Sequence, residues 1–316
     1  MRIPAEETPM RGRDDSAEGD DALRLHQRIT PIGGSAGSAP GTVFVGFACD
    51  AGVVRNHGRK GAAAGPAALR AQLGGLSAHF AHPLYDAGDV ACIDDDLEAA
   101  QEELGELVSR LLANGHRPVV AGGGHEVAWG SYLGIRSALK MRGEGTGRLA
   151  VVNIDAHFDL RASDRPSSGT PFRQMAELSR SDGKGFNYFC LGVAEAANTA
   201  ALFRAAGEFG ATYRSDLEMQ AVPYELLTDI TERFEHIYLT VDLDALPASA
   251  MPAVSAPAAL GVPAAVVLEC VRFLRGSGRL ILSDIAELNP LYDIDGHGAR
   301  LAARVAYEMI GDAAAG

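Results

Sequence analysis

Six acidic and imidazole side chains follow three apolar runs of strand length, where neutral turn residues are more usual. The runs are residues 118–121, 149–154 and 236–241. The six residues are His125, Asp155, His157, Asp159, Asp242 and Asp244. The members of each acidic cluster lie two positions apart, so extended backbone would point them to the same side. The sequence thus indicates three groups of potential metal ligands.

The combination of these groups carries more weight than any single member, because aspartate, glycine and histidine are also ordinary turn and structural residues. Four carboxylates in one pocket would repel one another and take up protons unless cations lay between them. Oxygen ligands with two imidazoles suit six-coordinate Mn²⁺ better than four-coordinate zinc, and six ligands exceed what one ion ordinarily uses. We therefore expect two metal ions. Two ions about 3.5 Å apart can hold a hydroxide that attacks at neutral pH, which predicts a hydrolase.

From residue 43 onward, short apolar runs alternate with longer stretches of helical spacing. The predicted strands are residues 43–48, 118–121, 149–154, 186–192, 236–241 and 280–284. The predicted helices are residues 66–76, 97–113, 223–234 and 263–274. This alternation predicts an α/β fold, a mainly parallel sheet between two layers of helices. Ligands of such sheets bind at the carboxyl ends of the strands, where the acidic clusters fall.

The overall composition excludes several classes of protein. The 316 residues include 28 Lys and Arg against 41 Asp and Glu, a net charge of −13, so nucleic acid is not an expected partner. No apolar run is long enough for a membrane span, and the charged first thirty residues do not resemble a secretory signal. The expected location is the cytoplasm. The four cysteines lack CxxC spacing and are predicted to be reduced.

The chain is expected to contain one catalytic domain preceded by an arm. Residues 1–40 are polar, and the glycine-rich stretch at 33–37 has the composition of a flexible joint. We assign residues 1–40 to an N-terminal arm and residues 41–316 to a single catalytic domain.

Four sequence blocks resemble those of the arginase-like ureohydrolases, binuclear manganese enzymes that hydrolyse C–N bonds of guanidino or amidino compounds. The blocks are GGGHE at 122–126, DAHFD at 155–159, DLD at 242–244 with MPAVSAP at 251–257, and DIAELNP at 284–290. The resemblance implies an arginase-like fold, two Mn²⁺ ions per subunit and a homo-oligomer. It assigns one ion to His125, Asp155, Asp159 and Asp242, and the other to Asp155, His157, Asp242 and Asp244. Glu287 would then face the cationic amidine of the substrate.

Two departures separate this chain from arginases and agmatinases, whose first block usually reads GGDHS. The first block here is GGGHE, and the segment SSGTPFRQ at 167–174 lacks the histidine that arginases carry in this loop. Both departures, together with segments 11–14, 24–27 and 52–59, resemble formimidoylglutamases of histidine degradation. The resemblance implies hydrolysis of N-formimidoyl-L-glutamate to L-glutamate and formamide by a manganese-bound hydroxide.

Two other interpretations remain open at this point. A guanidino hydrolase of the agmatinase, arginase or guanidinobutyrase type would release urea. A metal-binding protein that keeps the fold without catalysis would release nothing. Product analysis distinguishes the three.

An amidine substrate with an acidic tail requires local positive charge in a protein of net charge −13. Arg161 lies two residues after Asp159 and is the first candidate for a bidentate pair with a substrate carboxylate. The other candidates, each also compatible with a structural ion pair, are Arg55, Arg59 and Arg173. Asp159 and Glu287 are the expected catalytic residues. Glu287 would orient the amidinium, and Asp159 would relay a proton to the leaving nitrogen.

Overall fold

The computed structural model describes residues 1–33 and 38–312, and the strands of this part of the chain form one sheet. The strands are β1 (Arg2–Ile3), β2 (Ile29–Pro31), β3 (Thr42–Ala48), β4 (Leu84–Ala91), β5 (Arg117–Ala121), β6 (Leu149–Ile154), β7 (Asn187–Val193), β8 (Thr212–Ser215), β9 (His236–Asp242) and β10 (Leu280–Ala286). Their order is β1-β4-β3-β5-β10-β9-β6-β7-β8, and β2 pairs with β4. Only the pairing of β1 with β4 is antiparallel among the described strands. The mainly parallel sheet predicted from the sequence is confirmed.

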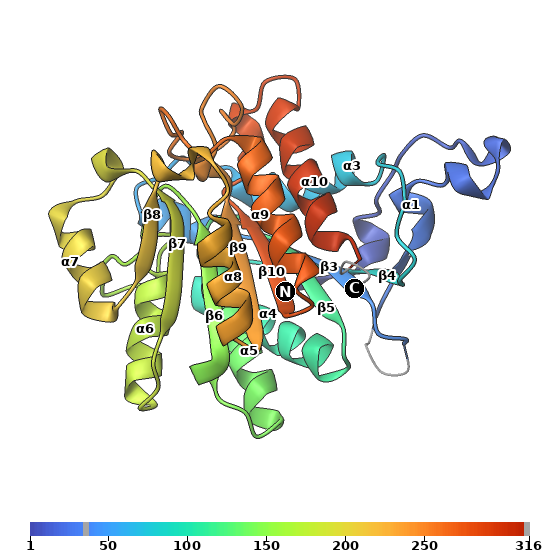
Figure 1. The fold of residues 1–316 in the computed structure, drawn as a ribbon. Coiled ribbons are helices and arrows are strands. Elements are labelled where there is room, and N and C mark those ends of the chain that lie inside the picture. The colour runs from blue at the N-terminus through green and yellow to red at the C-terminus, as the bar shows by residue number, and fades with distance from the viewer. Residues whose placement is uncertain (34–37, 313–316) are drawn as a thin grey trace.

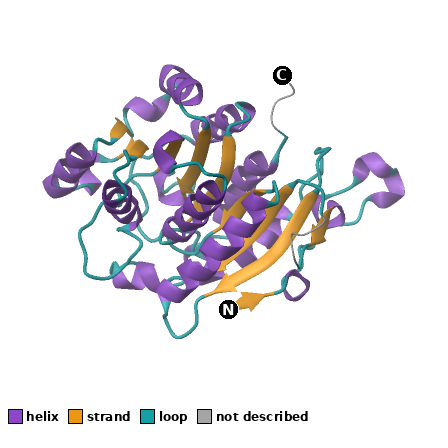
Figure 2. Ribbon diagram, turned by 90° about the horizontal axis from the view of Figure 1, so that it is seen from below, coloured by secondary structure: helices purple, strands orange, loops and turns teal. Residues whose placement is uncertain are grey.

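Helices cover both faces of this sheet, as Figures 1 and 2 show. They are α1 (Leu25–Arg28), α2 (Ala51–Arg55), α3 (Gly65–Leu73), α4 (Leu97–Ala113), α5 (Val127–Met141), α6 (Pro171–Ser181), α7 (Ala200–Phe209), α8 (Tyr224–Arg233), α9 (Ala264–Gly276) and α10 (His297–Ile310). One hydrophobic cluster includes residues of α3, α8, α9 and α10, and a second includes residues of α4 to α7. The fold therefore has the three expected layers. In the described part of the chain, no helix is long and apolar enough to cross a membrane.

The central strands bury side chains on both of their faces. In β5, Val119 packs in the first cluster and Val120 in the second. In β6, Val152 packs in the first cluster and Val151 in the second. Burial on both faces explains why these strands appear in the sequence as continuous apolar runs.

The predicted strands and helices are all present, with ends that shift by a few residues. The hydrophobicity pattern does not predict β4, because this strand carries the buried aspartates Asp86 and Asp89. Arg70 of α3 forms ion pairs with both carboxylates, and its Nε lies 3.0 Å from Asp86 Oδ2. A partner distant along the chain thus makes these buried charges tolerable.

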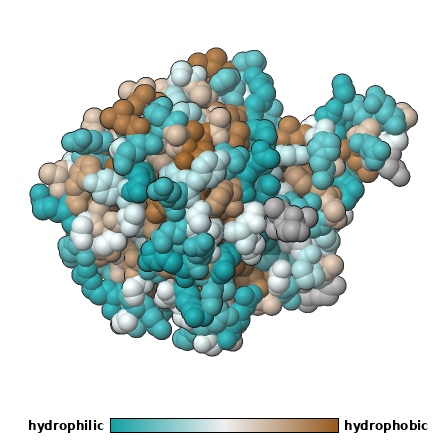
Figure 3. Space-filling model, in the orientation of Figure 1, coloured by the Kyte–Doolittle hydropathy of each residue, from teal (hydrophilic) through white to brown (hydrophobic). Residues whose placement is uncertain are grey.

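Two short strands within residues 1–33 of the expected arm lie along one edge of the sheet. β1 and β2 both pair with β4, and Leu25 of α1 is buried in the first hydrophobic cluster. The blue segment that projects at the right of Figure 1 belongs to this region, and Figure 3 shows largely hydrophilic residues on it. Of the expected flexible joint at 33–37, all but Gly33 lies outside the described residues.

The structure contains the cysteines as free thiols, in agreement with the prediction. Cys49, Cys190 and Cys270 are buried, and Cys92 is partly buried. Their burial indicates a packing role.

Four neighbouring strands, β5, β10, β9 and β6, end at the same edge of the sheet because they run parallel. His125 follows β5, Asp155 follows β6, Asp242 ends β9 and Glu287 follows β10. The topology therefore brings together side chains from segments that are far apart in the sequence.

Candidate metal centre and catalytic cavity

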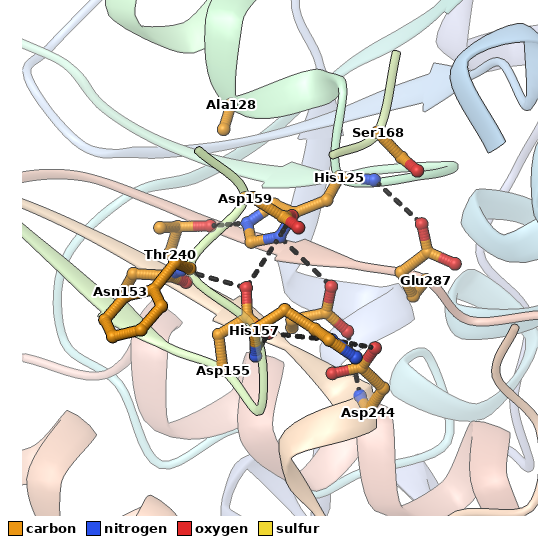
Figure 4. Close-up of polar contacts among 12 residues, drawn as sticks. His125, Ala128, Asn153, Asp155, His157, Asp159, Ser168, Thr240, Asp244 and Glu287 are labelled. Atoms are coloured by element: carbon orange, nitrogen blue, oxygen red, sulfur yellow. Dashed lines mark hydrogen bonds and ion pairs between the residues drawn. The ribbon is translucent and has the colours of Figure 1, made fainter. Parts of the chain in front are cut away.

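His125 points toward three carboxylates at the centre of the strand ends (Figure 4). Its Nδ1 lies 3.2 Å from Asp155 Oδ2, 3.1 Å from Asp159 Oδ2 and 3.0 Å from Asp242 Oδ2. This Nδ1 is buried and has no hydrogen-bond partner among the described residues. A lone pair directed at the midpoint of several carboxylate oxygens fits a bound cation.

A second group adjoins the first. His157 Nδ1 lies 3.5 Å from Asp155 Oδ1 and 3.1 Å from Asp244 Oδ2. The ligand atoms of Asp155, His157 and Asp244 lie within 4.8 Å of one another, as do those of the first group. Asp155 belongs to both groups, so it would contribute a ligand to each of two bound ions. The geometry puts Asp242 in the first group, so its expected contact with the second ion stays a proposal.

Backbone and side-chain hydrogen bonds orient these carboxylates. Asp155 Oδ1 accepts from the His157 N–H at 2.6 Å, and its Oδ2 accepts from Asn153 Nδ2 at 2.9 Å. Asp242 Oδ1 accepts from the Asp244 N–H at 2.8 Å. These hydrogen bonds orient both acidic clusters, and Asp242 Oδ2, which faces His125, takes no part in them.

Behind His125 lies a buried polar partner that the sequence analysis missed. Thr240 Oγ1 is 2.9 Å from His125 Nε2, on the side of the ring away from the carboxylates (Figure 4). A partner at one ring nitrogen fixes which nitrogen faces the metal. The available signal was the spacing, because Thr240 precedes Asp242 by two residues in the same strand and therefore shares its face.

The neighbouring carboxylates raise the pKa values of both histidines. Burial alone would lower the pKa of His125, but the surrounding carboxylates outweigh it and raise this pKa well above the ordinary value. The charge of Asp244 raises the pKa of His157 in the same direction.

The carboxyl groups also perturb one another. Burial and the neighbouring charge of Asp244 raise the pKa of Asp242 well above its ordinary value, and burial raises the pKa of Asp244 to about 6. Asp155 behaves oppositely, because the two histidines overcome the effect of burial and lower its pKa. Such mutual shifts are expected where like charges share a site that needs cations.

Two site residues have left-handed backbone conformations that are rare outside glycine. φ is +46° at Asp159 and +71° at Glu287. The Glu287 N–H donates to Gly123 O at 2.7 Å, and its Oε1 accepts from the His125 N–H at 3.0 Å. Backbone strain of this kind persists where the surroundings hold a side chain in a required direction.

A cavity of about 230 Å³ opens over the two ligand groups. His157, Asp159, Asp242, Asp244 and Glu287 lie in its wall. The outer wall contains the residues Asn56, His57, Gly58, Arg161, Ser168, Leu202, Ser255 and Ala256. Two expected catalytic residues therefore share one cavity with the expected metal ligands.

Arg161 is the one predicted substrate-binding arginine that lines this cavity within the described chain. It is exposed at the rim, its backbone N–H donates to Gly169 O at 2.9 Å, and its guanidinium has no partner in the described chain. The group is therefore available to a ligand.

The other three arginines are held elsewhere. Arg55 forms a bidentate ion pair with Glu98, with N–O distances of 2.9 and 3.0 Å. Arg59 donates to backbone carbonyls and lies 3.8 Å from the Tyr292 ring centroid. Arg173 pairs with Glu177 at 2.7 Å. The structure does not bring Arg55, Arg59 or Arg173 into the cavity wall, because each guanidinium has a structural partner.

Several cavity residues were not singled out from the sequence. Asn56, His57 and Gly58 lie in the segment 52–59, and Ser168 and Ser255 lie in the segments 167–174 and 251–257. Sequence resemblance marked these segments as wholes. The residue types alone do not mark these positions as parts of a site, and only the cavity shows that they belong to one.

Comparison with known proteins places the chain among relatives of the same length. Residues 41–311 match the Arginase family. The chain is 48% identical over 317 residues to the formimidoylglutamase of Cupriavidus pinatubonensis, covering 98% of this chain and 100% of that protein. It is 49% identical to the formimidoylglutamase of Chromobacterium violaceum, covering 94% and 96%.

Solved structures agree with these matches. The Trypanosoma cruzi formiminoglutamase with Mn²⁺ superimposes with a TM-score of 0.77 at 30% identity, covering 86% of this chain and 92% of that chain. The formimidoylglutamase of Bacillus subtilis has a TM-score of 0.80 at 21% identity, covering 97% and 98%, which supports the fold alone. The sequence resemblance and the expected fold are both confirmed.

The shared position of Asp155 predicts the effect of removing it. Asp155→Ala is expected to deplete both ions and to lower activity by more than about 100-fold, since loss of outer partners of metal ligands alone costs about 10- to 100-fold. Metal analysis after gel filtration measures the stoichiometry. Asp182→Ala, at a surface ion pair with Arg136, is the control and should keep two ions. Two ions per subunit in Asp155→Ala would refute the bridging assignment.

The raised histidine pKa values predict proton release on metal binding. The carboxylates raise the pKa values of His125 and His157 above the ordinary value, so Mn²⁺ binding is expected to displace protons from these nitrogens. Because protons compete for the same nitrogens, apparent Mn²⁺ affinity should fall as the pH is lowered from 8 to 6. Titration calorimetry in buffers of different ionisation enthalpy measures the release. Binding without proton release, or with affinity that rises at lower pH, would contradict this description.

Proposed function

The chain belongs to the arginase family, and from this premise we propose that it hydrolyses N-formimidoyl-L-glutamate to L-glutamate and formamide, as a formimidoylglutamase in histidine degradation. The observation that carries the proposal is the position of Arg161. Its free guanidinium lines the same cavity as Glu287 and the metal-ligand groups. A cation is therefore available for an acidic tail beside the carboxylate that suits an amidinium.

The two ligand groups fit two Mn²⁺ ions, since they offer carboxylate oxygens and imidazole nitrogens, and His125 Nδ1 and Asp244 Oδ1 are buried without a hydrogen-bond partner among the described residues. When bound, the ions supply Lewis acidity that activates a water molecule for attack on the formimidoyl carbon. The proposed ligands are His125, Asp155, His157, Asp159, Asp242 and Asp244.

Glu287 is proposed to bind the amidinium of the substrate. One carboxylate oxygen accepts from the His125 N–H, and Oε2 is left without a partner among the described residues. Burial and the charge of Asp242 raise the pKa of Glu287 well above its ordinary value. An amidinium beside it would favour the ionised form and complete the pair. The pair would hold the formimidoyl carbon in attack geometry.

Asp159 is proposed to move a proton to the leaving nitrogen. It lines the cavity, and its left-handed backbone directs the carboxylate toward His125. Burial raises the pKa of Asp159, a shift in the direction that favours proton uptake by this carboxylate. The nitrogen then leaves as the amine of glutamate.

Arg161 is proposed to bind a carboxylate of the glutamate portion. A guanidinium presents parallel N–H donors that match a carboxylate and cannot serve a cationic tail such as that of agmatine. The same side chain therefore favours the formimidoyl substrate over cationic guanidino compounds.

The location, the oligomeric state and the domain division of the enzyme are also proposals. We assign it to the cytoplasm and expect a homo-oligomer, with residues 41–316 as the catalytic domain and residues 1–40 as an arm. β1 and β2 support this division, because they add to the edge of a sheet whose other described strands lie after residue 41.

A product assay tests the function. Manganese-loaded protein is incubated separately with formimidoylglutamate, arginine, agmatine and guanidinobutyrate, and formamide, glutamate and urea are measured. Formamide and glutamate in equal amounts from the first substrate are expected. Urea from a guanidino substrate, without formamide, would establish the alternative hydrolase, and no product from any of them would remove the enzymatic proposal.

Removal of the rim guanidinium should weaken substrate binding without loss of metal. Arg161→Ala is expected to lower kcat/KM for formimidoylglutamate by about 10- to 100-fold, the scale of one hydrogen-bonded charged pair. Arg165→Ala is the matched control, because Arg165 lies on the same loop but outside the cavity wall. Parent-like kcat/KM in Arg161→Ala, or an equal loss in both variants, would exclude Arg161 as the carboxylate anchor.

A further inference from the structure

The short helix α2 begins beside a buried carboxylate from another part of the chain. The Gly52 N–H donates to Glu126 Oε1 at 3.0 Å. The preceding residue Asp50 does not cap the helix, because its carboxylate accepts instead from the Gly61 N–H at 2.7 Å. The first N–H groups of a helix have no partner within the helix, and a buried one needs an acceptor. Glu126 supplies that acceptor from a position 74 residues away.

Glu126 also packs directly against the α2 backbone. Its side chain has no solvent exposure, and Gly52 is buried. A Cβ built on Gly52 would lie 2.5 Å from the carboxyl carbon of Glu126, and its three nearest atoms all belong to Glu126. The carboxylate thus occupies the space of a side chain at position 52.

The far end of α2 forms part of the catalytic cavity. The helix ends in a turn in which the Gly58 N–H donates to Val53 O at 2.8 Å, with a left-handed φ of +62° at His57. Asn56, His57 and Gly58 then line the cavity. Movement of α2 would therefore move one wall of the substrate site.

The same helix supports the loop that carries Arg161. Arg55 donates to Pro166 O at 3.1 Å, and Asn56 Nδ2 donates to Ser168 Oγ at 3.1 Å. A Cβ at Gly169 would lie 2.7 Å from Arg161 Cδ, so this loop packs closely on the arginine side chain. A continuous set of contacts leads from Glu126 through α2 to the substrate-binding rim.

We propose that Glu126 is a positioning residue, whose buried carboxylate caps α2 and thereby holds the Asn56–His57–Gly58 wall and the Arg161 loop in place for the substrate. Glu126 belongs to neither ligand group, and the ligand groups lie at the ends of β5, β6 and β9 and not on α2. The proposal deepens the proposed function and rests on it for its substrate.

The first test compares substrate binding in Glu126→Ala and Glu126→Gln. Glu126→Ala should raise KM for formimidoylglutamate roughly tenfold, with a smaller change in kcat and two Mn²⁺ ions retained, because a displaced wall weakens positioning of the substrate. Glu126→Gln keeps an oxygen acceptor for the Gly52 N–H and should restore KM to within about twofold of the parent.

Gln101→Ala is the matched control. Gln101 Nε2 donates to the backbone oxygen of Glu126 at 2.8 Å, so its removal disturbs the start of α5 and leaves the α2 contact intact. A KM increase in Gln101→Ala equal to that in Glu126→Ala would overturn the proposal, as would an unchanged KM or the loss of metal with unchanged KM in Glu126→Ala.

A second test needs no substrate and therefore separates this inference from the proposed reaction. Gly52→Ala should lower Tm in the parent protein, because the new methyl group collides with Glu126. In the Glu126→Ala background the space is open, so the same substitution should leave Tm unchanged or raise it. Equal losses of Tm in both backgrounds would show that Glu126 does not pack on α2. If the parent does not turn over formimidoylglutamate, the proposed function fails while this cycle still reports on the contact.

Discussion

The accumulation of buried carboxylates at the ends of four neighbouring strands is the constraint on which the rest of the structure depends. Four aspartates and one glutamate gather around only two imidazoles at these strand ends, inside a protein that is itself strongly acidic. Such a group is stable only with protons or cations between its members. The pKa values of Asp242 and His125 are both raised, as this requirement for protons or cations predicts. Two Mn²⁺ ions satisfy it and supply the reactive centre as well.

The backbone around this centre contains close approaches and rare conformations that bring the ligand side chains together. Gly123 lies so close to Cys49 that a Cβ there would be 1.6 Å from the Cys49 carbonyl oxygen. This approach allows the turn after β5 to deliver His125 while the Glu287 N–H donates to Gly123 O. The left-handed backbone at Asp159 and Glu287 belongs to the same arrangement. The surrounding strand ends hold these conformations.

Different elements of the fold position the metal-ligand groups and the outer wall of the cavity. The ligands stand on turns that follow the central strands, whereas the rim is formed by α2 and the loop that carries Arg161. Glu126 lies at the junction, because it follows the ligand His125 and caps α2. Substrate preference could therefore change through the rim while the metal centre stays as it is.

The sequence by itself determined the central strands, the four predicted helices and the three ligand clusters, because each depends on local spacing. Strands buried on both faces give unbroken apolar runs, and alternating aspartates share one side of an extended segment. The tertiary structure alone decided features that join distant segments. Arg70 forms ion pairs with the aspartates of β4, Glu98 holds Arg55 away from the cavity, and Glu126 fills the space over Gly52. These contacts depend on which segments become neighbours in space, and no local pattern in the chain records that.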